Sequence, residues 1–205
     1  MTASAEEVQR LRRTTGVGMM DAKRALEATE GDFDGAIKLL REQGLAEAGQ
    51  RSARAANQGT IGYYLHPNPD YPAVGVLVEL ASETDFVARS PEFQDLAHQL
   101  ALHIAARRPR WVSVEEVPAS EIADEEEVIR NQATNEGKPD EVIPKIVEGR
   151  MRSFYQDEVL YEQPFVNEER FGGTVGEMVQ QTAVQMGENV GVKRFARLAV
   201  GETTN

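Results

Sequence analysis

The chain has 205 residues, with 34 acidic and 22 basic side chains and a formal charge of −12. A chain of this length can bury one medium-sized hydrophobic core and a smaller one, so we expect two structural units. The acidity opposes a general attraction to nucleic-acid phosphates, which needs clustered Lys and Arg, and it predicts no direct nucleic-acid binding. The sequence has no cysteine, which excludes disulfides, thiolate catalysis and cysteine-ligated zinc.

The N-terminal residues MTASAEEVQRLRR contain no apolar segment of the kind found in secretory signal peptides. No later run approaches the roughly 18 apolar residues of a membrane-spanning helix. We therefore expect a soluble, cytoplasmic protein with no membrane partner.

Residues 1–50 are expected to form a small domain of three short helices. Ser4 and Glu7 have the spacing of a capping box at the start of the first helix, and Gly44 is expected to end the third. Apolar residues recur at helical spacing along this region; they are Val8, Leu11, Ala22, Ala25, Leu26, Phe33, Ala36, Ile37 and Leu40. The small and polar residues 51–59 are predicted to be a linker.

Residues 60–205 are expected to form a core domain of antiparallel sheet with helices. Alternating apolar residues on both sides of HPNPDYP predict a β-hairpin; they are Ile61, Tyr63, Leu65, Val74, Val76 and Val78. A helix follows, with Ser90 in a capping position and Pro91 at its first residue. VGVKRFARLAV predicts a further strand near the C-terminal end. Because sheet and helices are segregated along the chain, the predicted fold class is α+β.

Residues 119–160 have the pattern of an antiparallel helical hairpin. A narrow apolar seam with charged residues around it runs through this region; it consists of Val142, Ile143, Ile146, Val147, Met151 and Phe154. Gly137 is expected to end the first helix of the hairpin and Pro139 to begin the second. Beyond the hairpin, Thr174 and Glu177 have capping-box spacing and predict one more helix.

Candidate catalytic and metal-binding constellations are scarce. His98 and His103 are five residues apart on one predicted helix, whereas a spacing of four would bring both to one metal ion. TGVGMMD begins as Gly-x-Gly, but it follows a helix and lacks the third glycine and the βαβ setting of a nucleotide-binding loop. Neither a Gly-x-x-x-x-Gly-Lys-Ser/Thr run nor a Gly-x-Ser-x-Gly elbow occurs. The sequence predicts no enzyme, no metal site and no cofactor.

ELASETDFVARSPEF, residues 79–93, places Phe86 in a short polar loop between a strand and a capped helix. Two interpretations follow from the residues alone. Phe86 either anchors the loop in the local core, which is the commoner arrangement, or projects towards a partner. Met19 and Met20 leave a similar choice between core packing and an adaptable contact surface.

Three long stretches, in this order, resemble the bacterial elongation factor Ts family: LRRTTGVGMMDAKRALEATEGDFDGAIKLLREQG, ETDFVA and NEGKPDEVIPKIVEGRMRSFYQDEVLYEQPFV. The resemblance implies a nucleotide exchange factor for elongation factor Tu, the GTPase that brings aminoacyl-tRNA to the ribosome. The three N-terminal helices also resemble a ubiquitin-associated domain. An alternative function is therefore a peptide-binding adaptor, built on an unrelated scaffold and without exchange activity.

The resemblance implies roles for three groups of residues. One group matches the family motif that displaces Mg²⁺ from Tu, with the phenylalanine wedged between two helices of the partner; it consists of Thr84, Asp85, Phe86 and Val87. A second group matches the surface of the N-terminal domain that touches the GTPase; it consists of Arg12, Met19 and Met20. Val166 and Asn167 match a region that touches a distal domain of Tu in longer relatives, although Asn167 replaces an apolar residue there.

The chain is short for this family. Many relatives carry two related sheet modules, whereas this sequence shows one hairpin-containing module and no internal repeat. A single module leaves a sheet edge or an apolar face exposed. Together with the resemblance to other short members, this implies a symmetric homodimer, which is noncovalent because the chain has no cysteine.

Overall fold

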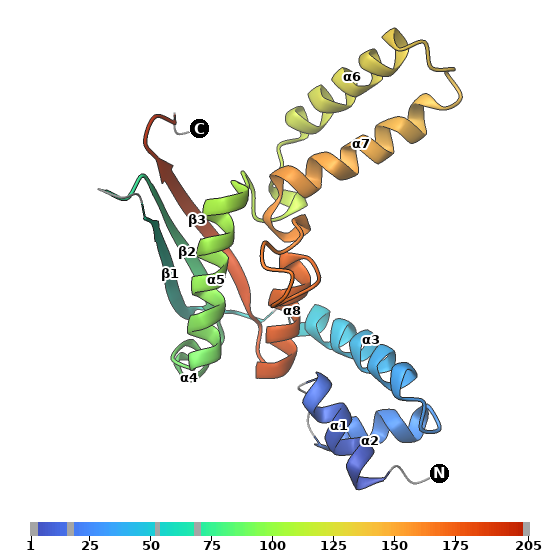
Figure 1. Ribbon diagram of the computed structural model, residues 1–205, viewed down its shortest axis with the longest axis vertical. Helices are drawn as coiled ribbons and strands as arrows, with labels where there is room; N and C mark the ends of the chain where they lie inside the picture. The colour runs from blue at the N-terminus through green and yellow to red at the C-terminus, as the bar shows by residue number, and fades with distance from the viewer. Residues whose placement is uncertain (1–3, 16–18, 52–53, 68–70, 203–205) are drawn as a thin grey trace. The chain divides into compact units, whose positions relative to one another are not determined.

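Figure 1 shows the computed structural model of the protein. It describes residues 4–15, 19–51, 54–67 and 71–202, with the backbone alone for residues 45–51. Eight α-helices and one three-stranded antiparallel sheet form the regular structure of these ranges, which confirms the predicted α+β class. None of the described helices is long and apolar enough to cross a lipid bilayer.

The chain divides into two compact units, each assembled from segments that are distant in sequence. The first unit consists of Met1–Gly59, Ala81–Ser90 and Val179–Gly191. The second unit consists of Thr60–Leu80, Pro91–Met178 and Val192–Asn205. The N-terminal helices therefore share a unit with the residues on either side of Phe86.

Three helices open the first unit: α1 (Ala5–Thr15), α2 (Met19–Ala28) and α3 (Phe33–Arg51). They pack around a small apolar cluster, which consists of Val8, Leu11, Ala22, Ala25, Leu26, Ala36 and Leu40. The predicted capping box of α1 is confirmed: the Ser4 N–H donates to Glu7 Oε2 at 3.0 Å, and the Glu7 N–H donates to Ser4 Oγ at 3.2 Å. The Ser4 hydroxyl also donates to Glu7 Oε2 at 2.6 Å. This bond first, and the bond from the Ser4 N–H second, hold the pKa of Glu7 below its usual value.

The prediction that Gly44 ends the third helix is wrong, because α3 continues to Arg51. Gly44 lies against Val184 of α8 (Val175–Met186), and a Cβ atom at Gly44 would lie 3.2 Å from Cγ2 of Val184. The missing side chain thus permits a close approach between helices and does not mark a helix end. Because α3 is longer than expected, it overlaps the predicted linker 51–59 at its first residue.

The three strands are β1 (Gln58–His66), β2 (Val74–Ser82) and β3 (Gly191–Ala199), in the order β1-β2-β3 across the sheet. The predicted hairpin of the first two strands and the predicted C-terminal strand are confirmed. β2 is central, and its inward residues Val76, Val78 and Leu80 are buried. The sheet therefore packs one of its faces against the hydrophobic core, as antiparallel sheets commonly do.

Helix α5 (Pro91–Arg107) lies along one face of the sheet (Figure 1). Its apolar face is buried as the sequence pattern predicts; the residues are Phe93, Leu96, Ala97, Leu100, Ala101 and Ile104. Gly62 of β1 lies directly beneath it, since a Cβ atom there would lie 2.2 Å from the carbonyl oxygen of Ala97. Only glycine allows strand and helix to approach this closely.

Helices α6 (Ala119–Asn135) and α7 (Ile143–Glu158) lie side by side in opposite directions (Figure 1). They share a separate apolar cluster, consisting of Ile129, Ala133, Ile143, Val147 and Met151. Gly137 ends α6 as predicted: its φ is +72°, and the Lys138 N–H donates to the Ala133 carbonyl at 3.1 Å. The predicted start of the second helix at Pro139 is wrong. Proline suits the first helical turn, where no N–H is needed, and Pro144 fills that role in α7.

Candidate functional site

The segment between β2 and α5 folds as a single helical turn, α4 (Asp85–Ala88), where the sequence suggested a loop. Thr84 is its N-cap, with an extended backbone at φ −122° and ψ 155°. Its Oγ accepts a hydrogen bond from the Val87 N–H at 3.3 Å. Threonine is a favoured N-cap residue because this bond satisfies an amide at the helix start that has no partner within the helix.

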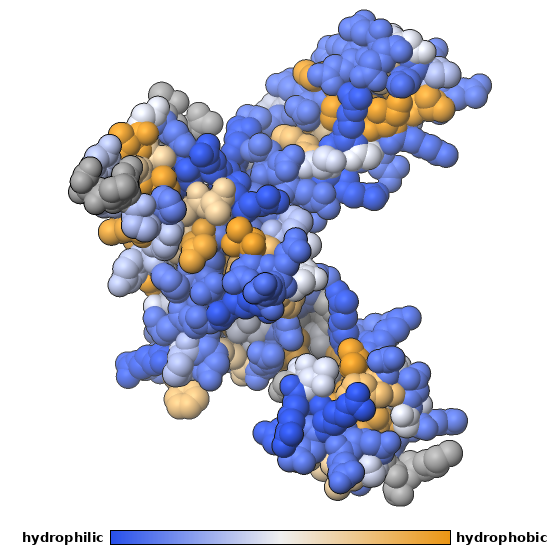
Figure 2. Space-filling model, in the orientation of Figure 1, coloured by the Kyte–Doolittle hydropathy of each residue, from blue (hydrophilic) through white to orange (hydrophobic). Residues whose placement is uncertain are grey.

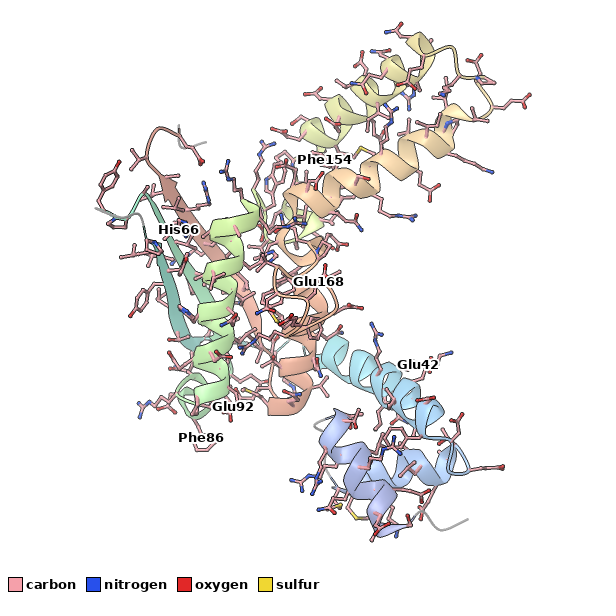
Figure 3. All side chains as sticks on the ribbon, viewed as in Figure 1. Glu42, His66, Phe86, Glu92, Phe154 and Glu168 are labelled. Carbon is pink, nitrogen blue, oxygen red and sulfur yellow. The ribbon has the colours of Figure 1, made fainter. Side chains whose placement is uncertain are left out.

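Phe86 projects from this turn with 83% of its surface exposed (Figure 3). The next two residues, Val87 and Ala88, are buried. Successive helical residues point about 100° apart, so a turn that buries these two directs Phe86 outwards. The interpretation in which Phe86 anchors the segment in the local core is therefore wrong. Asp85 is also exposed, and its carboxylate lies 3.0 Å from the Arg89 guanidinium in a surface ion pair.

Glu188, in the turn between α8 and β3, binds the start of this segment. Its Oε2 accepts hydrogen bonds from the N–H groups of Glu83 at 3.0 Å and Thr84 at 3.1 Å, and its Oε1 accepts from Thr84 Oγ at 2.6 Å. The Glu83 carboxylate in turn accepts from the Asn189 N–H at 2.7 Å and lies 3.6 Å from the Arg54 guanidinium. The Asn189 side-chain amide donates to the Arg54 carbonyl at 2.8 Å. We call these five residues the clamp.

The N-terminal candidates lie on the surface of the three-helix cluster. Arg12 is exposed near the end of α1. Met19 and Met20 are the first two residues of α2 and are 46% and 65% exposed. Both methionines therefore lie outside the small core, and the choice left open by the sequence is settled in favour of exposure.

Val166 and Asn167 lie in a short connection that follows the buried Phe165. The Val166 N–H donates to Nδ1 of His103 at 3.1 Å, and its side chain is 41% exposed. Asn167 begins a turn, because its side-chain Oδ1 accepts from the Arg170 N–H at 3.2 Å. This local hydrogen bond gives a physical reason for asparagine at this position.

His103 is fully buried, and both of its ring nitrogens are bonded. Since Nδ1 accepts from Val166, the proton lies on Nε2, which donates to Oε1 of Gln163 at 2.9 Å. The imidazole stacks on Phe165 with a centroid distance of 5.6 Å. Burial lowers the pKa of His103 to about 4, so the ring is neutral near pH 7. It is a structural residue.

In the part of the chain that the structure describes, no group of three or more His, Asp or Glu side chains is arranged to hold a metal ion. His98, the other histidine of α5, lies with Nδ1 at 3.2 Å from the carbonyl oxygen of Tyr63. The distinctive feature of the segment after β2 is thus geometric: an exposed apolar side chain, Phe86, on a braced helical turn.

Comparison with known proteins identifies the family. The model of the family described as Elongation factor TS matches residues 47–202. The chain belongs to the elongation factor Ts family. The elongation factor Ts of Fervidobacterium nodosum is 48% identical over 202 residues, which cover 98% of this chain and 100% of that relative. The factor from Coprothermobacter proteolyticus is 46% identical with the same coverage, and that from Thermosipho melanesiensis is 45% identical over 199 residues.

Members of the elongation factor Ts family act in the elongation phase of protein synthesis, and this chain is accordingly a translation elongation factor. Its short length is shared with the matched relatives, since the alignments cover nearly all of both chains.

Sequence reasoning missed the clamp. Glu83 opens the ETDFVA stretch but received no role of its own, Glu188 and Asn189 carry no motif, and Glu188 is 104 residues away from Thr84 along the chain. Each residue by itself looks like an ordinary polar surface position. The only local signal is Gly187, whose φ of +70° marks a tight turn just before Glu188.

Proposed function

We propose that this member of the elongation factor Ts family is a guanine nucleotide exchange factor for elongation factor Tu. The observation that carries the proposal is the exposed Phe86, which stands on a capped helical turn with buried residues directly behind it. Aromatic residues of this kind dominate the binding energy of many protein interfaces.

The proposed mechanism requires no bond making or breaking by this chain. GDP is held in a GTPase by phosphate contacts and a bridging Mg²⁺, which is the largest local charge in the site. A phenylalanine wedged between two helices of the partner shifts the loops that hold this ion. Thr84, Asp85 and Val87 serve the wedge by capping, flanking and anchoring the turn. Loss of the ion then weakens GDP binding and accelerates its release.

Thermodynamic linkage constrains this function. The factor and the nucleotide bind the same GTPase with opposite preferences, so each must weaken binding of the other by the same factor. GTP can therefore eject the factor once GDP has left. The chain acts as a reversible exchange factor and not as an enzyme in this scheme.

Two further surfaces are proposed to bind Tu. Arg12 on α1 and Met19 and Met20 on α2 are each exposed, and methionine adapts its shape to a contact surface more readily than branched residues do. Val166 and Asn167 form a second, smaller contact. We propose no direct contact with nucleic acid, because the chain carries a formal charge of −12.

The test is the rate of release of a fluorescent GDP analogue from the cognate Tu, with and without this protein. We expect acceleration that saturates with the concentration of the factor. Unchanged release would reject exchange and favour the alternative, in which the three-helix, ubiquitin-associated-like domain is a peptide-binding adaptor. A pull-down from a bacterial lysate separates the two further, since only the exchange factor should capture Tu.

We also propose that the chain forms a noncovalent homodimer through the face of the sheet that α5 leaves uncovered. Exposed apolar side chains gather on this face; they are Ile61, Tyr63, Leu65, Leu77 and Leu198. Figure 2 shows hydrophobic atoms at the surface beside the strands. Leu65 and Leu198 also line a shallow apolar groove together with Val74 and Val200.

Light scattering tests the dimer. We expect twice the 22.7 kDa mass of one chain, and we expect Tyr63→Asp to give monomers because a charge would be buried in the interface. The matched control is Gln185→Asp, which places the same charge on an exposed part of α8. A monomeric mass for the unaltered chain at micromolar concentration would reject the dimer.

A further inference from the structure

The clamp concentrates its hydrogen bonds on the two residues that precede α4. Three donors converge on one carboxylate: the N–H groups of Glu83 and Thr84 and the hydroxyl of Thr84, at 3.0, 3.1 and 2.6 Å from Glu188. The contact is reciprocal, because the Asn189 N–H donates back to Glu83 at 2.7 Å. Two backbone segments are thus fixed against each other by side chains from both.

The hydroxyl of Thr84 connects the clamp to the turn that carries Phe86. A threonine hydroxyl has a single proton. Here that proton is donated to Glu188, so the lone pairs of Oγ are free to accept from the Val87 N–H at 3.3 Å. Glu188 therefore fixes both the position of Thr84 and the direction of its hydroxyl, and through them the start of α4.

We propose that Glu188 is a positioning residue for nucleotide exchange, which sets the direction in which Phe86 projects. This inference rests on the proposed exchange function. Glu188 itself makes no contact with Phe86; it acts through Thr84 and the capped turn. A wedge transmits force only if its base is held, and a displacement of about 1 Å in a positioned group can change a rate by up to about a hundredfold.

Three observations favour positioning over a general structural role. The donors to Glu188 are confined to the residues before α4, and Val87 and Ala88 already anchor the turn by burial. The carboxylate lies at a partly exposed site and not in the apolar core. Lastly, the Asn189 side chain binds the carbonyl of Arg54, which follows α3, so the backbone that leads from the N-terminal helices is bonded to the same clamp.

The chemistry of the acceptor gives a graded series of variants. A carboxylate can accept all three hydrogen bonds, whereas the carboxamide of Glu188→Gln has only one oxygen and turns its NH₂ group towards one of the donors. Glu188→Ala removes every acceptor. Glu188→Gln thus leaves one donor without its acceptor and Glu188→Ala leaves all three without one, so the alanine variant should have the larger effect.

The experiment measures release of fluorescent GDP from Tu over a range of factor concentrations. We expect Glu188→Ala to lower the maximal rate about tenfold and Glu188→Gln about threefold, with a smaller change in the half-saturating concentration. The matched control is Gln185→Ala, an exposed polar residue close by in sequence, which should match the unaltered protein. Equal maximal rates for Glu188→Ala and the unaltered protein would overturn the inference.

A double-mutant cycle with Phe86→Ala separates positioning from a direct or structural effect. If Glu188 acts only through Phe86, Glu188→Ala causes no further loss in the Phe86→Ala background. If instead the two losses multiply, Glu188 acts independently and the inference is wrong. A merely destabilising substitution would lower both backgrounds alike.

Hydrogen exchange of the backbone amides supplies a readout that does not depend on Tu. We expect Glu188→Gln to increase exchange at residues 83–87 at least threefold while the amides of β2 stay unchanged. Unchanged exchange at residues 83–87 would overturn the clamp even if GDP release slowed. If the unaltered protein failed to accelerate GDP release at all, the proposed function would fail, and faster amide exchange would still support the clamp.

Discussion

Phe86 and Val166 are both exposed apolar side chains on short connections. A charged carboxylate holds the backbone beside Phe86, whereas a neutral imidazole holds the backbone of Val166. The turn of Phe86 is braced at a partly exposed site by the carboxylate of Glu188. The backbone of Val166 is braced in the interior by His103, a neutral imidazole that is itself fixed by Gln163. The two side chains also differ in solvent exposure: Phe86 is 83% exposed and Val166 is 41% exposed.

The difference between carboxylate and imidazole determines the conditions under which each segment stays in place. A carboxylate near the surface forms strong charge-assisted hydrogen bonds without a large desolvation penalty. A buried imidazole avoids that penalty only while it is neutral, so its brace depends on pH. We therefore expect the Val166 segment to lose its support in acid, and we expect the Phe86 turn to depend mainly on the presence of its acceptor.

The largest expected effect concerns His103 and the pH dependence of stability. Its pKa falls from 6.5 to about 4 on folding. Between these values the unfolded chain binds a proton that the folded chain does not, so the free energy of unfolding decreases as the pH falls. The slope is about 1.4 kcal/mol per pH unit, and the full loss between pH 6.5 and 4 is about 3 kcal/mol.

Denaturant unfolding of the unaltered protein and of His103→Gln, at several pH values, measures this effect. Glutamine keeps one acceptor for Val166 and one donor for Gln163 but does not titrate. The difference in unfolding free energy between the two proteins should be flat above pH 6.5 and shrink below it. Parallel curves from pH 7 to pH 4 would mean that folding does not lower the pKa of His103, and the contrast drawn between the two braces would be wrong.

The second effect concerns Phe86. We expect Phe86→Ala to slow the release of GDP from Tu that this protein stimulates, on the order of 100-fold, because loss of an aromatic anchor is among the largest single-residue effects at an interface. Its thermal unfolding midpoint should stay within about 2 °C, since the side chain packs against little of its own chain. Stopped-flow release and a thermal melt on the same sample check both statements.

An unchanged release rate with a lowered midpoint would reverse the assignment. Phe86 would then stabilise its own fold and would not act on a partner. Phe86→Tyr is the matched control, because it keeps the ring and should keep most of the exchange rate.

Features encoded by local spacing could be predicted from the sequence. The capping boxes at Ser4 and Thr174 form as expected, the latter with the Glu177 N–H donating to Thr174 Oγ at 3.2 Å. The Gly137 helix end forms because a single backbone conformation, φ of +72°, requires glycine. In each case the cause and the effect lie within a few residues of one another.

Features that depend on a distant segment could not be predicted in this way. Gly44 resembles a helix end in sequence, but the reason for it is the side chain of Val184. Glu188 resembles an ordinary surface glutamate until the fold brings it to Thr84. The direction of Phe86 belongs to the same class, because burial of the two residues after it decides the orientation.

The smallest expected effect concerns Val166. We expect Val166→Ala to slow GDP release about threefold, because a half-exposed aliphatic side chain contributes less to an interface than an aromatic anchor. His103→Gln should leave the rate nearly unchanged at pH 7.5, where its acceptor oxygen still holds the Val166 N–H. A loss from Val166→Ala as large as that from Phe86→Ala would make the braced interior segment an equal partner in exchange. Because the two contacts belong to separate segments, a cycle between these variants should be additive, and a non-additive result would show that both loops act through one rearrangement of Tu.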